Sequence, residues 1–199
     1  GPEGLDYLVR MQNAAARMQV LIQDLLSLSR VASNSKPYAS VDLNDVVATV
    51  VSDLEMRILD CQGRVDVGLL PNMWGDRGQM AQLVQNLIGN GLKFRKPGQN
   101  PVVKVSSELQ KLASGDAMWW ITVEDNGIGF DEKYRDRIFQ IFQRLHGRNE
   151  YEGTGIGLAI CRKIVERHGG SISASSTPGS GAKFLITLPT QTPGANSNE

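Results

Sequence analysis

Three short motifs rich in asparagine and glycine constrain what this chain of 199 residues can fold into. We call them the asparagine, aspartate and glycine motifs; they read Gln85-Asn-Leu-Ile-Gly-Asn-Gly-Leu-Lys-Phe94, Asp125-Asn-Gly-Ile-Gly-Phe130 and Gly153-Thr-Gly-Ile-Gly-Leu158. The glycine motif is not a Walker sequence, because no Gly-Lys-Ser/Thr follows it. It is not a clean dinucleotide fingerprint either, because no strand pattern precedes it and Leu158 stands at its last position. Together the motifs predict a nucleotide site that is not a P-loop.

The asparagine motif lies on the 79–94 part of a helix predicted to open at Asp76. The apolar stripe of this helix consists of Met80, Leu83, Val84, Leu87 and Ile88. The adjoining face, with spacings i, i+4, i+7 and i+8, carries Asn86, Asn90, Lys93 and Phe94. Half-buried amides cost free energy unless they are paired, and magnesium offers oxygen coordination together with bridges to phosphates. Lys93 adds a compact positive charge for those phosphates. Two amides on a solvated helix edge are the alternative, and this motif alone does not decide between them.

The aspartate motif follows a strand predicted over residues 119–124. The carboxylate of Asp125 at the strand end can accept a hydrogen bond from an exocyclic amine such as that of adenine. Gly127 and Gly129 permit close backbone approach and positive φ. Taken alone, a tight turn is the commoner explanation, because Asp, Asn and Gly all favour turns.

The glycine motif opens a helix predicted over residues 156–168. Successive glycine amides at a helix N-terminus can form an anion site. A flexible hinge before the helix explains a lone glycine loop equally simply. The occurrence of all three motifs in this order favours the nucleotide site.

A heptad seam runs along a long helix predicted over residues 3–33. Its apolar positions alternate spacings of three and four: Leu8, Met11, Ala15, Met18, Ile22 and Leu25. Because a terminal stripe of this length needs a partner, we favour half of a dimerising helical hairpin over a helix docked on its own domain. The polar segment 33–37 ends the helix and marks a domain boundary.

The remaining patterns predict an α/β (α+β) two-layer sandwich, with a mixed sheet of about five strands and about three helices on one face. We expect one domain over residues 38–190 and a disordered tail over 191–199. Predicted helices cover 44–58, 76–94 and 156–168, with a short helix near 134–142. Predicted strands cover 41–43, 64–69, 101–108, 119–124, 171–175 and 182–188.

Charge and cysteine content exclude several classes of function. Lys and Arg total 21 and so do Asp and Glu, which gives no support to nucleic-acid or membrane binding. No apolar run reaches the roughly 18 residues of a membrane helix. Cys61 and Cys161 lack metal-ligand spacing and are expected to be buried thiols in a reducing cytoplasm. We therefore expect a cytoplasmic fragment of a longer protein, which could itself be membrane-anchored upstream.

The order of the three motifs, with a Phe-rich segment between the last two, resembles the catalytic ATP-binding domain of sensor histidine kinases. That fold is shared with gyrase, mismatch-repair and heat-shock ATPases, and the resemblance covers about residues 41–190. Residues 139–145 look like the Phe box of the family, and the run 139–170 is especially similar to phytochrome-like sensor kinases. Residues 3–33 resemble the second helix of the dimerisation and phosphotransfer hairpin.

The resemblance implies roles for single residues. Asn90 would be the main magnesium ligand, and Asn86 would support the metal or its water. Lys93 would touch phosphate, Phe94 would wall the adenine pocket and Asp125 would accept from the adenine amine. The other implied ATP-site residues are Gly127, Gly129, Phe130, Gly153, Thr154, Gly155, Ile156, Gly157, Leu158 and Thr187, the last acting through water.

The sequence also departs from the pattern of the family. Residues 143–154 would form the mobile lid, but the usual arginine of the lid is replaced by Gly147, so Arg144 and Arg148 are both candidates for the γ-phosphate contact. Gly91 replaces the common alanine and should loosen the helix slightly. Neither histidine has the phosphoacceptor context: His146 falls in the lid, and His168 would favour a helix dipole.

The implied function is binding of Mg-ATP and transfer of its γ-phosphate to a histidine on a hairpin helix that precedes residue 3. Asn86 cannot act as a base, whereas ATPases of this fold place a glutamate there to activate water. The implied partners are a second copy through the N-terminal helix, a response regulator receiver domain and an upstream sensory domain. A non-catalytic nucleotide-binding and dimerisation module is the alternative, and a protein-serine kinase of the same fold is a weaker third.

Overall fold

The computed structural model describes residues 2–33, 38–112, 115–145, 147, 150–151 and 153–190. The helices are α1 (Pro2–Ser33), α2 (Leu43–Asp53), α3 (Glu55–Asp60), α4 (Arg77–Lys93) and α5 (Gly157–Arg167), with short 3-10 helices η1 (Glu132–Tyr134) and η2 (Arg137–Phe139). The strands are β1 (Ala39–Asp42), β2 (Arg64–Val67), β3 (Asn72–Gly75), β4 (Val102–Lys111), β5 (Ala117–Asp125), β6 (Ser171–Ser176) and β7 (Ala182–Pro189). The tail predicted to be disordered lies outside the described residues.

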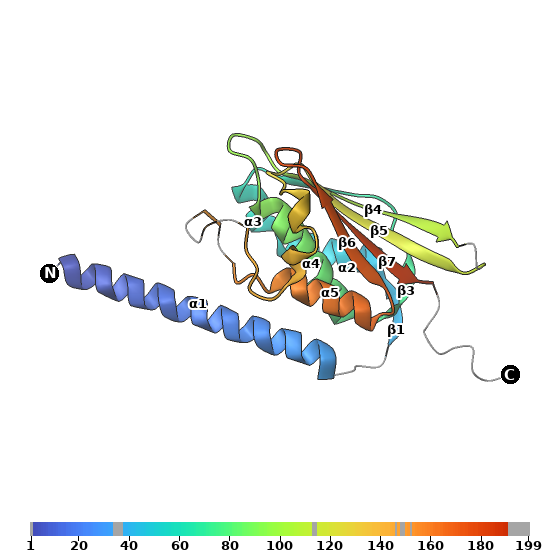
Figure 1. Cartoon of the computed structure of the whole chain (residues 1–199), viewed down its shortest axis with the longest axis horizontal. Coiled ribbons are helices and arrows are strands. Elements are labelled where there is room, and N and C mark those ends of the chain that lie inside the picture. Colours follow the sequence, from blue (N-terminus) through green and yellow to red (C-terminus); the bar gives the residue numbers. More distant parts are fainter. Residues whose placement is uncertain are drawn as a thin grey trace.

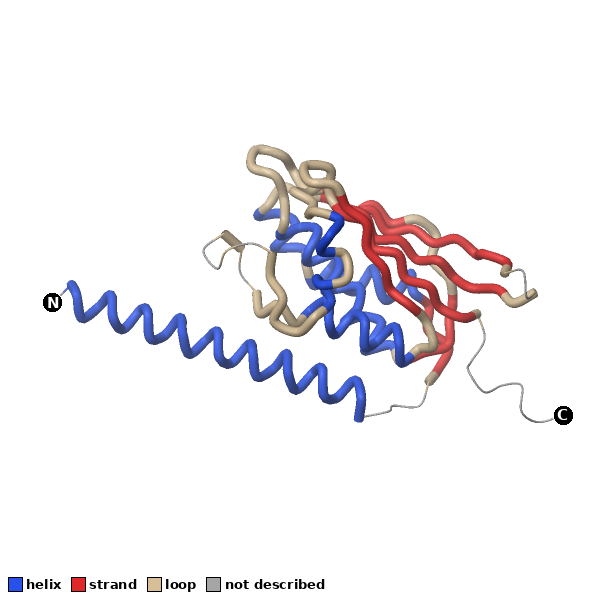
Figure 2. The backbone as a smooth tube through the Cα atoms, viewed as in Figure 1, coloured by secondary structure: helices blue, strands red, loops and turns tan. Residues whose placement is uncertain are grey.

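A mixed five-stranded sheet with helices on one face confirms the predicted fold class. Its strand order is β2-β4-β5-β7-β6, and β2 pairs with β4 in parallel while the other pairs are antiparallel. Helices α2 to α5 cover one face of this sheet (Figures 1 and 2). The other face carries the outward residues of each strand, because side chains alternate along a strand.

Two features of the sheet region differ from the sequence prediction. The strand predicted at 41–43 belongs to β1, which pairs with the unpredicted β3 in a separate two-stranded ribbon. The helix predicted over 44–58 is divided at Leu54 into α2 and α3. Apolar periodicity continues through Leu54, so the pattern alone does not show this break.

Helix α4 forms the centre of the helical layer and carries the asparagine motif. The Asp76 carboxylate caps its first turn by accepting from the backbone N–H groups of Gly78 and Gln79, at 2.9 and 3.2 Å. Its apolar stripe is buried, and it packs against α2, α5, β4 and β5. The cap and the packing together fix where the last turn of α4 ends.

Gly91 brings the last turn of α4 close to the sheet. A Cβ added at Gly91 would lie 2.6 Å from Cγ2 of Val103 and 3.2 Å from Cβ of Asp125. An alanine would therefore require the Val103 side chain or α4 itself to shift. This close approach places the asparagine motif beside the aspartate motif, and the expected loosening of the helix by Gly91 stays a prediction.

Helix α1 uses different faces for its own domain and for solvent. Leu21 and Leu28 pack on the core and Val31 is buried, where α1 runs along α5. The predicted heptad seam faces away, and its large apolar residues, Leu8, Met11, Met18, Ile22 and Leu25, are 42–68% exposed. The N-terminal half of α1 extends beyond the domain (Figure 1).

Among the described residues, no helix combines the length and the apolar character needed to cross a bilayer.

His168 is buried close to Tyr38, where the chain enters the domain that follows α1. Its Nε2 accepts the backbone N–H of Asp76 at 3.1 Å, and its Nδ1 lies 2.7 Å from the Ile164 carbonyl, which assigns the proton to Nδ1. The Tyr38 ring stacks on it at 4.7 Å between centroids. Burial lowers the pKa of His168, and nearby Arg167 lowers it further. The expected role of His168 as a charged partner of the helix dipole is therefore wrong, because the neutral ring satisfies both of its nitrogens.

We predict that stability falls on acidification because of His168. The unfolded chain takes up a proton near pH 6.5 that the folded chain binds only at lower pH, so the free energy of unfolding decreases below that pH. The slope should reach at most about 1.4 kcal/mol per pH unit. Urea unfolding between pH 5 and 8 measures it, and His168→Gln should show a flatter dependence. Equal slopes in the two proteins would exclude His168 as the cause.

Candidate functional site

On the helical side of the sheet, the end of β5 lies against the last turn of α4, and the start of α5 lies against Asn86 one turn earlier. Asp125 ends β5, and its Oδ1 accepts the backbone N–H groups of Gly127 and Ala182 at 2.8 and 3.2 Å. Burial raises the pKa of Asp125, and the two N–H donors oppose this rise. Among the described residues no donor bonds to Oδ2, so that oxygen is available to an amine of a ligand.

Glycines hold the aspartate motif against the neighbouring backbone. A Cβ added at Gly127 would overlap the carbonyl oxygen of Phe94, the residue that caps the C-terminus of α4. Gly129 has a φ of +62°, and a Cβ there would overlap the carbonyl oxygen of Thr177. Phe130 donates its N–H to Oγ of Ser176 at 2.8 Å and packs on the core. The aspartate motif is therefore held in one conformation by close backbone contacts and is not a loose turn.

Asn86 is directed toward the glycine motif. Its Nδ2 donates to the Gly157 carbonyl at 3.4 Å, and its side chain also bonds to the Cys161 thiol. Burial raises the pKa of Cys161 to about 12, so this thiol is neutral and inert. Asn86 thus links α4 to the first turn of α5 in this structure.

Asn90 lies one turn beyond Asn86 on the same side of α4. Its side chain is half-buried and has no hydrogen-bond partner among the described residues. An amide oxygen in this setting fits magnesium, which accepts one or two protein oxygens and completes its shell with water and phosphate. The described residues contain no group of three or more His, Cys, Asp or Glu side chains that could hold a metal without such help.

Lys93 and Phe94 meet the lid at the end of α4. The Lys93 Nζ lies 4.1 Å from the centroid of the Phe94 ring. The Phe94 ring packs against Tyr151 at 5.0 Å between centroids, and the Tyr151 hydroxyl donates to the Arg95 carbonyl at 3.4 Å. A Cβ added at Gly153 would lie 3.1 Å from Lys93 Nζ. Lys93 and the first glycine of the glycine motif are therefore neighbours.

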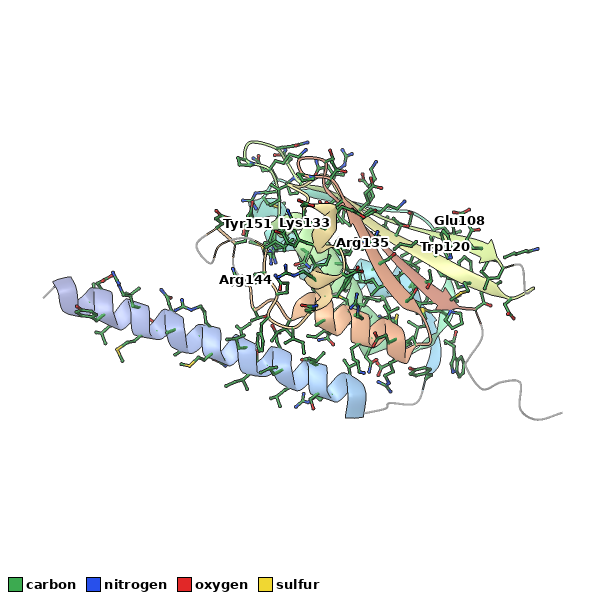
Figure 3. The ribbon with its side chains drawn as sticks, in the orientation of Figure 1. Glu108, Trp120, Lys133, Arg135, Arg144 and Tyr151 are labelled. Carbon is green, nitrogen blue, oxygen red and sulfur yellow. The ribbon has the colours of Figure 1, made fainter. Side chains whose placement is uncertain are left out.

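Arg144 binds the backbone of its own lid. It donates to the carbonyl groups of Gly153 at 2.6 Å, Tyr151 at 2.5 Å and Gly147 at 3.5 Å. Figure 3 shows Arg144 and Tyr151 together on the lid side of the helical layer. The other candidate, Arg148, lies outside the described residues, as does His146.

The glycine motif combines left-handed glycines with apolar anchors. Gly153 and Gly155 have φ values of +136° and +76°. Ile156 is fully buried and Leu158 packs on the core, so these two residues fasten the motif with their side chains. The Thr154 hydroxyl donates to the Asp24 carboxylate on α1.

Thr187 is not part of this cluster. It alternates with the buried residues Ile186 and Leu188 on β7, so it lies on the opposite face of the sheet. Its hydroxyl lies 2.8 Å from Oγ of Ser171, and its partner across the strand is Trp120. Trp120 lies toward the far end of the sheet from Arg144 (Figure 3). A contact with a nucleotide beside Asp125 does not agree with this position.

Sequence reasoning missed the backbone that does reach Asp125 from β7. Ala182, the first residue of the strand, donates its N–H to the carboxylate. Gly181 has a φ of +86°, and a Cβ there would overlap the Asp125 carbonyl oxygen. Gly179 and Gly181, between the strands predicted over 171–175 and 182–188, are the signal in the sequence for this close approach.

A cavity of about 390 Å³ lies at the opposite end of α4 from the cluster. Its walls are mostly small apolar residues: Ala39, Val46, Thr49, Gly75, Asp76, Arg77, Gly78 and Ala81. The Asp76 carboxylate is already used to cap α4. We therefore place the functional site at the cluster of motifs and not at this cavity.

The family described as histidine kinase-, DNA gyrase B- and HSP90-like ATPase matches residues 75–192. The chain belongs to this family. The matched residues include all three motifs, and this confirms the ATP-binding catalytic domain of the histidine kinase type that the sequence predicted.

Named members of this family resemble the chain over most of its length. Phytochrome-like protein Cph1 of Synechocystis sp. is 39% identical over 184 residues, which are 92% of this chain and 24% of Cph1. The chain thus spans about a quarter of the length of this curated relative. The similarity confirms the predicted phytochrome-like subgroup.

Two solved structures share the fold. Full-length ShkA in complex with AMPPNP has a TM-score of 0.73 and 24% identity, and the match covers 96% of this chain and 39% of that one. Histidine kinase ThkA in complex with response regulator protein TrrA has a TM-score of 0.68 and 22% identity, and the match covers 96% and 53%.

Proposed function

We propose that the chain binds Mg-ATP at the cluster of motifs and donates the γ-phosphate to a histidine on a dimerisation helix, for relay to a response regulator. The observation that carries the proposal is Asp125, a half-buried carboxylate held through one oxygen and open at the other, beside the last turn of α4, which carries Asn90. The AMPPNP complex of ShkA, which shares the fold, supports the choice of nucleotide.

The residues divide into an adenine end and a phosphate end. Asp125 Oδ2 accepts from the adenine amine, and Phe94 walls that end. Lys93 faces the phosphates next to Gly153. Asn90 would hold magnesium, with Asn86 behind it, and the bound ion would supply positive charge against the phosphates. Arg144 reaches the γ-phosphate only after it leaves the lid carbonyl groups.

The chemistry expected at this site is phosphoryl transfer to a protein nucleophile. Asn86 cannot remove a proton from water, and its amide is already bonded to Gly157. Catalysis then consists of positioning the γ-phosphate in line with an imidazole nitrogen while cations neutralise the transferred charge. Formation of the N–P bond accompanies breakage of the bond to the ADP oxygen.

We also infer the setting in which this domain acts. The exposed seam of α1 fits a second copy of the chain. A receiver domain is the expected acceptor downstream, as the complex of ThkA with a response regulator protein suggests. Both cysteines are free and buried, in keeping with a reducing cytoplasm.

A phosphotransfer assay tests the proposal. The chain alone should not label itself with radioactive ATP, because its histidines, His146 and His168, lack the phosphoacceptor context. Adding a hairpin that carries the acceptor histidine should produce acid-labile label on the hairpin. ATP binding without any transfer would instead favour the alternative, a non-catalytic nucleotide-binding and dimerisation module. Acid-labile label on the chain itself would contradict the expected absence of an acceptor.

A further inference from the structure

A hydrogen bond joins α1 to the glycine motif. The Thr154 hydroxyl donates to the carboxylate of Asp24, across 130 positions of sequence. The same hydroxyl accepts the N–H of Ile156 at 3.3 Å, so it also closes the turn of the motif itself. Asp24 is half-buried on the face of α1 that docks on the domain, between Leu21 and Leu28.

Opposite charges approach the glycine motif from two helices. Lys93 on α4 lies beside Gly153, whereas Asp24 on α1 bonds to the next residue. Over the described part of the chain, no Lys or Arg forms an ion pair with Asp24. Its negative charge is therefore directed at a loop whose amides and neighbouring lysine attract anions.

We propose that Asp24 is a positioning residue that holds Thr154 while α1 is docked and opposes the nucleotide phosphates by its charge. The inference rests on the proposed function, because it requires the phosphates to lie at the glycine motif. Docking of α1 on α5 and binding of the nucleotide then disfavour each other. By linkage, each weakens the other by the same factor.

The variant Asp24→Asn removes the charge and keeps an oxygen that can accept from Thr154. It should bind a fluorescent ATP analogue with magnesium at least about fivefold more tightly than the unchanged chain. The gain should be largest for ATP, smaller for ADP and absent for adenosine, because the repulsion acts on phosphate charge. A merely structural change in the lid would alter all three affinities alike.

Asp6→Asn is the matched control. It removes the same charge from the same helix, at an exposed residue that pairs with Arg10 at 2.7 Å. Its nucleotide affinities should equal those of the unchanged chain. Hydrogen exchange provides the reciprocal measurement: ATP should speed exchange over residues 21–31, and should do so less in Asp24→Asn.

The outcomes separate this inference from the proposed function. If the unchanged chain binds the ATP analogue and Asp24→Asn binds it equally or more weakly, the role of Asp24 is overturned. A gain of the same size for adenosine would overturn it as well, since adenosine carries no phosphate. If the unchanged chain does not bind ATP at all, the proposed function fails, and this inference with it.

Discussion

Asp125→Asn will bind a fluorescent ATP analogue about 100-fold more weakly than the unchanged chain. The Gly127 and Ala182 amides will hold the remaining oxygen of the amide, as they hold Oδ1 now. The new NH₂ group then occupies the position of Oδ2 and faces the adenine amine. Because both groups are hydrogen-bond donors, no bond forms between them. A lost charge-assisted hydrogen bond together with an unpaired buried donor costs roughly 3 kcal/mol.

The same variant should change which base is preferred. An inosine nucleotide presents a carbonyl oxygen where adenosine presents its amine, so the NH₂ group of Asp125→Asn can donate to it. We expect the ratio of ATP to inosine triphosphate affinity to fall in this variant. Asp131→Asn is the control, because Asp131 also caps a turn by accepting from the Lys133 N–H at 3.1 Å but is exposed. Unchanged ATP affinity in Asp125→Asn would remove Asp125 from the site.

Asn90→Ala will make nucleotide binding nearly independent of magnesium. In the unchanged chain, adding magnesium to an EDTA-treated sample should tighten ATP binding by about tenfold or more, which corresponds to roughly 1.4 kcal/mol from one oxygen ligand. Without the Asn90 amide, that ratio should approach one. Alanine favours helix, so α4 should remain folded.

Gln85→Ala is the matched control for this experiment. It removes an amide from the same helix, but at an exposed position. Its magnesium dependence should match that of the unchanged chain. Titrations of each variant with ATP, in magnesium and in EDTA, provide the comparison. A full magnesium effect in Asn90→Ala would show that another residue holds the ion.

Local patterns predicted those parts of the site that depend on local chemistry. The asparagine motif could be assigned to a helix face because helical spacing fixes which side chains are neighbours. The glycines of the other two motifs could be assigned to close approaches because positive φ and small size restrict those positions. The five-stranded sheet followed from the order of strand and helix patterns, which the observed topology confirms.

Contacts between distant segments could not be predicted in this way. Gly91 is set by Val103 and Asp125, which lie on two strands that follow later in the chain. Ala182 contributes a backbone N–H, and no residue type marks a position for that role. The resemblance implied a water-mediated role of Thr187 at the adenine, but the alternation of β7 turns Thr187 to the other face. Asp24 gains its partner only when α1 docks.

The two faces of α1 would allow this helix to contact its own domain and a partner helix at the same time. At 3.6 residues per turn, the docking face around Leu21 and Leu28 lies roughly 90° around the helix from the heptad seam around Met18 and Ile22. A partner helix in the seam and the catalytic domain on the adjoining docking face would therefore use different side chains of α1. The contact of the seam with a partner helix could therefore persist while the contact of the docking face with the catalytic domain forms and separates.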